Sequence, residues 1–242
     1  MTECLLADHR QLWHQKPALR EVYSYYYREI AAICRSGRTL EIGGGIGNFK
    51  TFMPDVISSD IQPSVTLDVV ADAQRLPFAQ SSFENIVMFD VLHHLEQPLM
   101  FLAEAARVLQ PGGRIVVCEP AITPLSRVFY RLFHPEPFDM KADLLAEASL
   151  SRADDPWDSN QAVPTLMFGR QRTRIERHMP ELSIRRARLL AMLAYPLSGG
   201  FRPWSAIAAP LVKPLLAIER RVEPLLGPLM AFRLLGVIEK AQ

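Results

Sequence analysis

Leu40-Glu-Ile-Gly-Gly-Gly-Ile-Gly47 decides the fold of this chain, because it places an acidic residue and then alternating glycines where a buried strand turns into a helix. Gly43, Gly45 and Gly47 have no Cβ to block a ligand, and we expect them to leave backbone N–H groups open. Glycine-rich turns between a strand and a helix are common. The stretch alone therefore predicts a nucleotide-like cofactor without specifying which one.

Length, charge and cysteine content narrow the class of protein. The 242 residues suit one α/β domain over residues 1–242, which buries its core without disulfides or metals. A net charge of +1 argues against a nucleic-acid-binding surface, so we expect a small-molecule partner and no bound metal. Cys4, Cys34 and Cys118 form no CxxC pair. The N-terminus lacks the order of a signal peptide and no apolar run reaches about 18 residues, which predicts a cytoplasmic protein that spans no membrane.

Short apolar runs alternate with helical patterns through the first half of the chain. Residues 8–36 predict one or two leading helices, and residues 98–109 predict an amphipathic helix. Strands are expected at residues 39–42, 56–59, 67–70, 85–89 and 114–118. Such alternation is typical of a parallel sheet. Only residues 61–66 separate the second strand from the third, which predicts a trimmed crossover.

The pattern after Pro120 is helical and interrupted by prolines, with a long loop around residues 153–160 and a helix over 164–178. Residues 182–190 and 232–239 predict two further strands. Between them an amphipathic helix is expected, because its apolar face recurs at steps of four and three residues: Leu211, Leu215, Ile218, Val222, Leu225 and Leu229. We place this helical insert at about residues 203–231. The whole then divides into leading helices (1–37), a cofactor-binding half (38–120) and a second half (121–242).

Four positions in and after the glycine turn bear on the kind of nucleotide. Asn48 stands where the dinucleotide fingerprint GxGxxG requires its third glycine, which disfavours NAD. Asp60 ends the second strand, where its carboxylate is placed to accept two hydrogen bonds from ribose hydroxyls. Asp72 and Ala73 follow the third strand, where a carboxylate and the next backbone N–H are placed to read an adenine. Ordinary cap or turn roles are the alternatives for both aspartates.

Five blocks in order carry a family resemblance: Glu41-Ile-Gly-Gly-Gly-Ile-Gly47, Asp60, Ala71-Asp-Ala-Gln-Arg-Leu-Pro-Phe78, Ser82-Phe-Glu-Asn-Ile-Val-Met-Phe-Asp-Val-Leu-His-His-Leu95 and Arg107-Val-Leu-Gln-Pro-Gly-Gly-Arg-Ile115. They resemble the small-molecule, type 11-like branch of the class I S-adenosylmethionine-dependent methyltransferases over residues 39–120. The resemblance implies a Rossmann-like α/β fold: a seven-stranded, mostly parallel sheet with flanking helices, a leading helical lid and a helical insert before the last strand. It also implies S-adenosyl-L-methionine as cofactor and S-adenosyl-L-homocysteine as product.

Carried over block by block, the resemblance assigns cofactor contacts to these residues: Glu41, Gly43, Gly44, Gly45, Asp60, Ile61, Asp72, Ala73, Phe89 and Asp90. Glu41 would approach the methionine amino group, and Asp60 would bind the ribose. Phe89 and Asp90 would flank the sulfonium. The favoured reaction is methylation at oxygen or carbon of a small or amphiphilic acceptor, such as a glycan, lipid or secondary-metabolite intermediate, because an Asn-Pro-Pro-Tyr type amine motif is absent.

Methyl transfer is a direct displacement that mainly requires alignment, which supplies roughly 7–11 kcal/mol. A hydroxyl acceptor also needs its proton removed. His93 and His94 are the nearest candidates for that base, and Glu119 is a further one. The alternatives are structural: the histidine pair orders a loop, and Glu119 forms an ion pair at the end of the sheet.

Two surface features leave partners open. Trp13, Tyr23 and Tyr27 in the leading helices are lid candidates, with plain packing as the alternative. A run of basic residues in the second half is either a solvated face or attractive to an anionic acceptor or a phospholipid surface: Arg170, Arg172, Arg174, Arg177, Arg185, Arg186 and Arg188. With the apolar insert, this predicts peripheral membrane contact as one option and a homodimer or core burial as others.

Two other function classes remain open from the sequence. A nicotinamide oxidoreductase shares the glycine turn, although Asn48 and the Leu109-Gln-Pro-Gly-Gly113 block disfavour it. A noncatalytic module that binds S-adenosylmethionine and presents the insert to another chain would also keep the acidic anchors.

Overall fold

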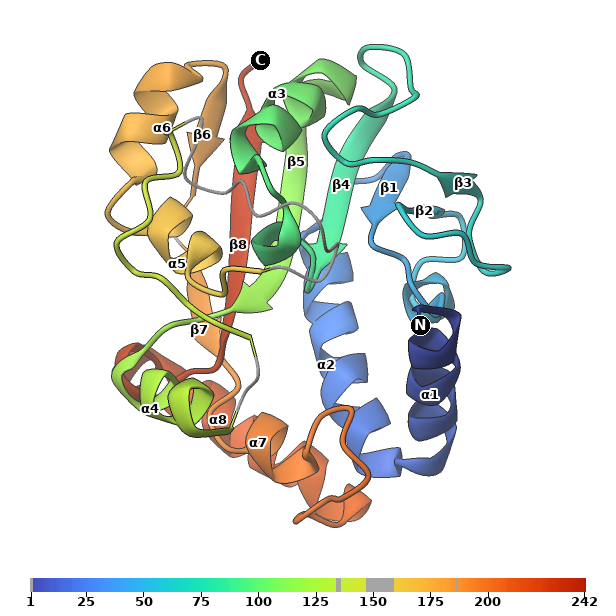
Figure 1. The fold of residues 1–242 in the computed structure, drawn as a ribbon, viewed down its shortest axis with the longest axis vertical. Coiled ribbons are helices and arrows are strands. Elements are labelled where there is room, and N and C mark those ends of the chain that lie inside the picture. Colours follow the sequence, from blue (N-terminus) through green and yellow to red (C-terminus); the bar gives the residue numbers. More distant parts are fainter. Residues whose placement is uncertain (1, 134–135, 147–158, 186) are drawn as a thin grey trace.

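A mixed sheet forms the centre of the computed structural model, which describes residues 2–133, 136–146, 159–185 and 187–242 (Figure 1). Its strand order is β3-β2-β1-β4-β5-β8-β6, and β7 also pairs with β8. The strands are β1 Thr39–Ile42, β2 Ile57–Asp60, β3 Val69–Val70, β4 Phe83–Phe89, β5 Leu109–Pro120, β6 Leu182–Ile184, β7 Arg188–Leu190 and β8 Arg233–Lys240. The five strands expected before Pro120 are therefore all present.

Strand directions confirm the predicted Rossmann-like sheet. The pairs formed among β1 to β5 are all parallel, and β8 runs antiparallel to β5, β6 and β7. Strand β6 pairs with residues 238–240 and β7 with residues 233–235, so the single strand expected over 182–190 is split in two along β8. Because β6 and β7 both lie along the same side of β8, they fill one place in the sheet. The sheet then has seven places, and β8 is the strand that runs in the opposite direction.

Helices cover both faces of the sheet (Figure 1). Ile86 and Met88 of β4 pack with α3, α5 and α6, whereas Val87 and Phe89 pack with α2 and α8 on the other face. Successive side chains of β4 thus point to opposite faces of the sheet, and both faces are buried. The helices are α1 Thr2–Gln15, α2 Pro17–Ile33, α3 Pro98–Val108, α4 Pro124–Phe133, α5 Val163–Phe168, α6 Arg172–His178, α7 Ala194–Ser198 and α8 Ala209–Met230.

Two expectations from the sequence need correction, and a third is largely untested. The glycine turn leads into a short 3-10 helix, Asn48–Thr51, rather than an α-helix. The helix expected over 164–178 is divided into α5 and α6 around Gly169. Most of the loop expected around residues 153–160 lies outside the described residues. No described helix is both long and apolar enough to cross a membrane.

Helix α8 is rotated by about one residue from the expected amphipathic pattern, so that a neighbouring stripe is buried. Leu211, Ile218 and Leu225 of the predicted apolar face are exposed to solvent. The buried side includes Glu219 and Glu223 together with Val212, Leu216 and Gly227. A helix that turns its carboxylates inward needs partners for them, since a buried charge without hydrogen bonds is costly.

Glu219 finds its partners in the residues that lead into α7 and in its first residue. Its carboxylate accepts hydrogen bonds from the backbone N–H groups of Met192 at 3.0 Å, Leu193 at 2.7 Å and Ala194 at 2.7 Å. The first N–H groups of a helix have no partner within the helix, and the positive end of the helix dipole favours an anion there. Glu219 therefore fixes α7 against α8.

We expect Glu219→Gln to lower the free energy of unfolding by roughly 1–3 kcal/mol, because an amide makes weaker hydrogen bonds and leaves a buried donor without a partner. Urea denaturation measures this change. Arg221→Gln, on the exposed side of the same helix, is the matched control and should change stability by less than about 0.5 kcal/mol. Equal losses in both variants would contradict the capping role.

Candidate active site

A cavity of about 620 Å³ opens beyond the carboxyl ends of β1 and β4. Ligands bind at this edge in open α/β sheets, where the strand order reverses direction. Side chains and backbone from both halves of the chain line it, among them Tyr23, Tyr27, Glu41, Gly43, Gly44, Gly45, Asp60, Ile61, Phe89, Asp90, His93, His94, Tyr130, Glu136, Gln161, Tyr195 and Arg233. The cavity therefore brings most of the predicted site residues together.

The three adjacent glycines of the turn have different reasons to be glycine. A Cβ on Gly43 would lie 2.0 Å from Val91 Cγ2, and one on Gly44 would lie 1.9 Å from Ser58 Oγ. Packing within the protein thus excludes side chains at these two positions. Gly45 has φ +47°, and its Cβ would meet nothing closer than a backbone oxygen at 3.9 Å. Gly45 is the position where a side chain would take up cavity space, so the backbone there is open to a ligand.

The backbone N–H groups of the turn are bonded within the protein, which makes the expectation of open donors wrong. Gly43 and Gly44 both donate to the carbonyl oxygen of Ser59, at 2.8 and 2.9 Å. Gly45 donates to Asp60 Oδ2 at 3.1 Å, and Gly47 donates to Gly44 at 2.8 Å. The turn folds back onto β2, because neighbouring parallel strands end side by side. It offers a bare backbone surface to a ligand rather than a row of donors.

Asp60 and Ile61 line the cavity, whereas Asp72 and Ala73 are absent from its lining. The two oxygens of Asp60 accept from the N–H groups of Gly45 and, at 3.0 Å, Gln62. Each carboxylate oxygen has a second lone pair, so Asp60 retains capacity for hydroxyl donors. Asp72 Oδ1 accepts from the N–H of Gln74 at 2.8 Å, which is the turn role considered as its alternative.

Glu41 is a buried carboxylate on the cavity wall. Burial raises the pKa of Glu41 to about 7, although a hydrogen bond from Ser58 Oγ at 2.5 Å works in the opposite direction. Near neutral pH the group therefore exists in both charge states. A cation placed beside it would favour the ionised form.

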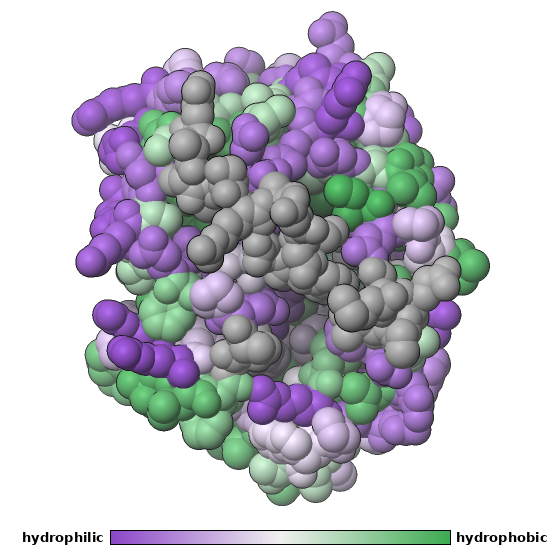
Figure 2. Space-filling view, in the orientation of Figure 1, coloured by the Kyte–Doolittle hydropathy of each residue, from purple (hydrophilic) through white to green (hydrophobic). Residues whose placement is uncertain are grey.

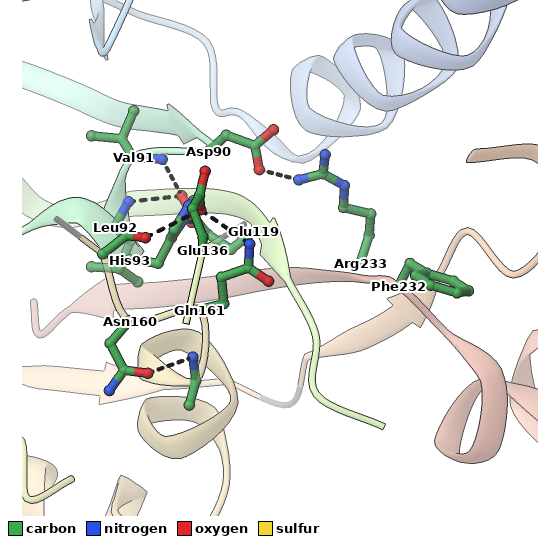
Figure 3. A network of polar contacts seen from close by, with 12 residues as sticks. Asp90, Val91, Leu92, His93, Glu119, Glu136, Asn160, Gln161, Phe232 and Arg233 are labelled. Atoms are coloured by element: carbon green, nitrogen blue, oxygen red, sulfur yellow. Dashed lines mark hydrogen bonds and ion pairs between the residues drawn. The ribbon is translucent and has the colours of Figure 1, made fainter. Parts of the chain in front are cut away.

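A polar network holds His93 between two carboxylates (Figure 3). Its Nδ1 lies 2.6 Å from Glu119 Oε2, and its Nε2 lies 3.5 Å from Glu136 Oε2. Burial alone lowers the pKa of His93, but the hydrogen bonds with Glu119 and Glu136 outweigh it and raise the pKa to about 9. Near neutral pH this favours the protonated form of His93, which has no lone pair with which to accept a proton.

His94 has the opposite character although it is the next residue. Its ring lies 4.1 Å from the His93 ring between centroids, and it lines the same cavity. Burial lowers the pKa of His94, and the charge on His93 lowers it further. Of the two histidines, His94 is thus the one that is neutral and able to accept a proton at neutral pH.

Glu119 lies beneath the cavity and is absent from its lining. Besides His93, its carboxylate accepts from the N–H groups of Val91 at 2.8 Å and Leu92 at 2.9 Å (Figure 3). The side chain has no exposed surface from which to reach an acceptor molecule. This placement corrects the expectation of a base at Glu119: the residue positions the loop that carries both histidines.

Asp90 and Arg233 form an ion pair on the cavity wall (Figure 3). The Arg233 guanidinium also lies 5.3 Å from the centre of the Phe89 ring and 4.5 Å from that of Tyr195, within the range of cation–π contacts. Sequence reasoning missed Arg233, although a charge directly before the apolar run of residues 234–238 was a usable signal. It also missed Tyr130, Glu136 and Gln161, which lie in a segment without a recognisable motif.

Of the lid candidates, Tyr23 and Tyr27 line the cavity, while Trp13 packs edge-on against Tyr23 with ring centres 6.2 Å apart. Leu6 and His9 of α1 add to the same wall. The leading helices therefore close one side of the cavity with aromatic and apolar surface.

Comparisons of sequence agree with this geometry. Residues 40–117 match a family model described as a methyltransferase domain. A demethylmenaquinone methyltransferase of Mycobacterium sp. (strain KMS) is 45% identical over 65 residues, which cover 27% of this chain and 28% of that protein. One of Beutenbergia cavernae is 31% identical over 101 residues, which cover 36% of this chain and 42% of that protein. The chain thus spans less than half the length of these curated relatives.

Solved structures share the fold over almost the whole chain. A methyltransferase structure from Thermotoga maritima, titled a possible histamine N-methyltransferase, covers 98% of this chain and 96% of its own, with a TM-score of 0.55 and 15% identity. One from Archaeoglobus fulgidus covers 91% and 94%, with a TM-score of 0.54 and 16% identity. The chain thus has the fold of these methyltransferase structures, and its residues 40–117 are similar to a methyltransferase domain.

Proposed function

We propose that this chain transfers a methyl group from S-adenosylmethionine to the oxygen or carbon of a small or amphiphilic acceptor. The observation that carries the proposal is a single cavity that joins the glycine turn and Asp60 to a neutral histidine, His94. A noncatalytic binding module would need only the first of these parts. The demethylmenaquinone methyltransferases named above support an apolar acceptor, but they match only the motif region.

The residues present fit the cofactor. Glu41 would pair with the methionine ammonium group, and Asp60 would accept from the ribose hydroxyls. The bare backbone at Gly45 leaves room for the chain that joins methionine to ribose. Ile61, beside Asp60, would give apolar surface to the base. Adenine contacts at Asp72 and Ala73 stay a prediction, because these residues do not line the cavity.

The reaction places modest demands on the protein. When bound, S-adenosylmethionine would supply a methyl group on a sulfonium: the acceptor atom bonds to that methyl carbon while the carbon–sulfur bond breaks and S-adenosylhomocysteine leaves. Phe89, Tyr23 and Tyr27 would exclude water from that path, and Phe89 and Asp90 would stand beside the sulfonium. A hydroxyl acceptor must also lose its proton, which His94 would take. Glu119 and Glu136 would keep His93 charged, so the proton is directed to His94.

The first prediction concerns the cofactor anchors. Asp60→Ala should weaken binding of S-adenosylhomocysteine by roughly 1.5–3 kcal/mol for each hydrogen bond lost, measured by calorimetry. Asp72→Ala should weaken it too if Asp72 reads the adenine. Asp55→Ala, at an exposed aspartate, is the control and should leave affinity unchanged. Unchanged affinity in Asp60→Ala, or binding of NAD instead, would show that this placement of the cofactor is wrong.

The second prediction follows from the raised pKa of Glu41. A carboxyl with a folded pKa of about 7 and an unfolded value of 4.5 stabilises the fold fully below pH 4.5, and this contribution is lost as pH rises through 7. Glu41→Gln should therefore stabilise the protein at pH 8 by on the order of 2 kcal/mol, with the gain gone by about pH 5. The same variant should bind S-adenosylhomocysteine more weakly at pH 8, because the ammonium loses its partner.

Thermal unfolding at the two pH values measures the stability change, and calorimetry measures the affinity. Glu181→Gln, at an exposed glutamate, is the matched control and should show neither effect. A stability gain that is equal at both pH values would rule out titration of Glu41 as its cause.

The third prediction separates the two histidines. His94→Ala should lower the release of S-adenosylhomocysteine with an active acceptor extract by roughly 10²–10⁴-fold, with cofactor affinity nearly unchanged. The rate should be flat between pH 7 and 9 in the wild type, because His94 is already neutral there. A rate that instead rises towards pH 9 would identify His93 as the base, since only its pKa is near that value.

A further inference from the structure

The outward side of α8 is apolar although it faces solvent. Ile218 is 56% exposed, Leu225 77% and Leu229 54%. Arg221 is the one cation near the centre of this side, and both glutamates of the helix are buried. A helix of a soluble protein usually shows the opposite distribution. Single exposed leucines are ordinary, but a continuous stripe of them points to a contact surface.

Helix α4 extends the same surface. It lies beside α8 at the lower left of Figure 1, and Figure 2 shows hydrophobic side chains gathered in that region. Leu125, Val128 and Leu132 of α4 are 40%, 55% and 67% exposed. We call these three residues, with Ile218, Leu225 and Leu229, the outer apolar face. Two adjacent helices thus expose one apolar surface rather than scattered side chains.

The charges beside the outer apolar face are all positive. Arg127 and Arg131 of α4 and Arg221 of α8 are exposed, and among the described residues none of them has an ion-pair partner. Neither helix exposes a carboxylate. A second copy of the chain packed on this face would bring the same cations together, which is unfavourable. An anionic surface would complement them.

The basic run that suggested a phospholipid surface from the sequence does not supply this charge. Arg172 pairs with Glu176, Arg174 with Asp143, and Arg185 with Glu239. These ion pairs neutralise much of the predicted excess, as expected for a solvated face. Arg170 and Arg177 form no such ion pair among the described residues, but Arg177 lies on α6 and Arg170 just before it, whereas Arg127, Arg131 and Arg221 lie on the helices that carry the apolar side chains.

Helix α4 contributes both to the outer apolar face and to the wall of the cavity. Phe129 and Tyr130 of α4 line the cavity, and they stand between the exposed residues Val128 and Arg131. Trp204, which is 46% exposed, lines the cavity too. Tryptophan is enriched where protein meets the boundary of a bilayer. A molecule held in a membrane beneath α4 would thus lie beside a helix that also forms part of the cavity wall.

We infer that the outer apolar face of α4 and α8 docks on a membrane containing anionic lipids. The apolar side chains would enter the boundary between headgroups and acyl chains, and Arg127, Arg131 and Arg221 would contact the phosphates. The acceptor would then be a membrane-resident amphiphile, a point that rests on the proposed methyl transfer. The docking itself does not depend on it.

Sedimentation of the full chain with vesicles tests the inference. The wild type should bind vesicles of phosphatidylcholine mixed with phosphatidylglycerol and bind pure phosphatidylcholine much more weakly. Leu132→Glu combined with Leu225→Glu should weaken binding at least about tenfold, because it places two charges in the apolar layer. Arg127→Gln combined with Arg131→Gln should weaken binding to the anionic vesicles by roughly fivefold per charge.

Val65→Glu combined with Met100→Glu is the matched control, because these apolar residues are 93% and 48% exposed elsewhere on the molecule. Equal weakening by the control, or no binding of the wild type to anionic vesicles, would overturn the inference. So would a wild-type dimer in analytical ultracentrifugation that Leu132→Glu and Leu225→Glu dissociate, since a second copy would then cover the face. Unchanged affinity for S-adenosylhomocysteine in this double variant distinguishes loss of docking from loss of the cofactor site.

Discussion

The carboxylate of Glu119 holds the loop after β4 against the end of β5, and the geometry of the cavity depends on it. Two backbone N–H groups and one imidazole share this buried anion. The arrangement fixes where His93 lies, sets its charge and, through that charge, keeps His94 neutral. Glu219 likewise accepts a hydrogen bond from a backbone N–H group at the start of α7, next to Tyr195 on the cavity wall. Buried carboxylates at the ends of helices and strands thus fix the backbone segments that line this cavity.

The first half of the fold was predictable because its signals are local. Strand β1 has the predicted bounds, and the glycine turn lies where an apolar run meets residues without side chains. What the turn does with its N–H groups was not predictable, since that depends on Ser59 and Asp60 of a strand formed later in the chain. The shape of the turn is local, whereas its hydrogen bonds are tertiary.

The second half shows why a periodic pattern does not fix an orientation. Leucines and isoleucine recur along α8 at helical spacing, yet the neighbouring stripe of Val212 and Leu216 is the one that packs on α2. Both stripes are apolar, so periodicity alone cannot choose between them. The choice falls to Glu219, because its carboxylate meets the free N–H groups of α7 only when that side faces inward. Arg233 was missed for a related reason: its partner, Asp90, lies far away in the sequence.

Asp90 has a positive φ of +57°, a conformation that costs free energy for a residue with a Cβ. Glycine would relieve that strain, and generic stabilising searches reward such exchanges. Here the exchange would leave the guanidinium of Arg233 buried without its anion, which costs far more than the backbone gains. A substitution of Asp90 that relaxes the backbone therefore also removes the anion that pairs with Arg233. We expect single substitutions at this position to lower the free energy of unfolding rather than raise it.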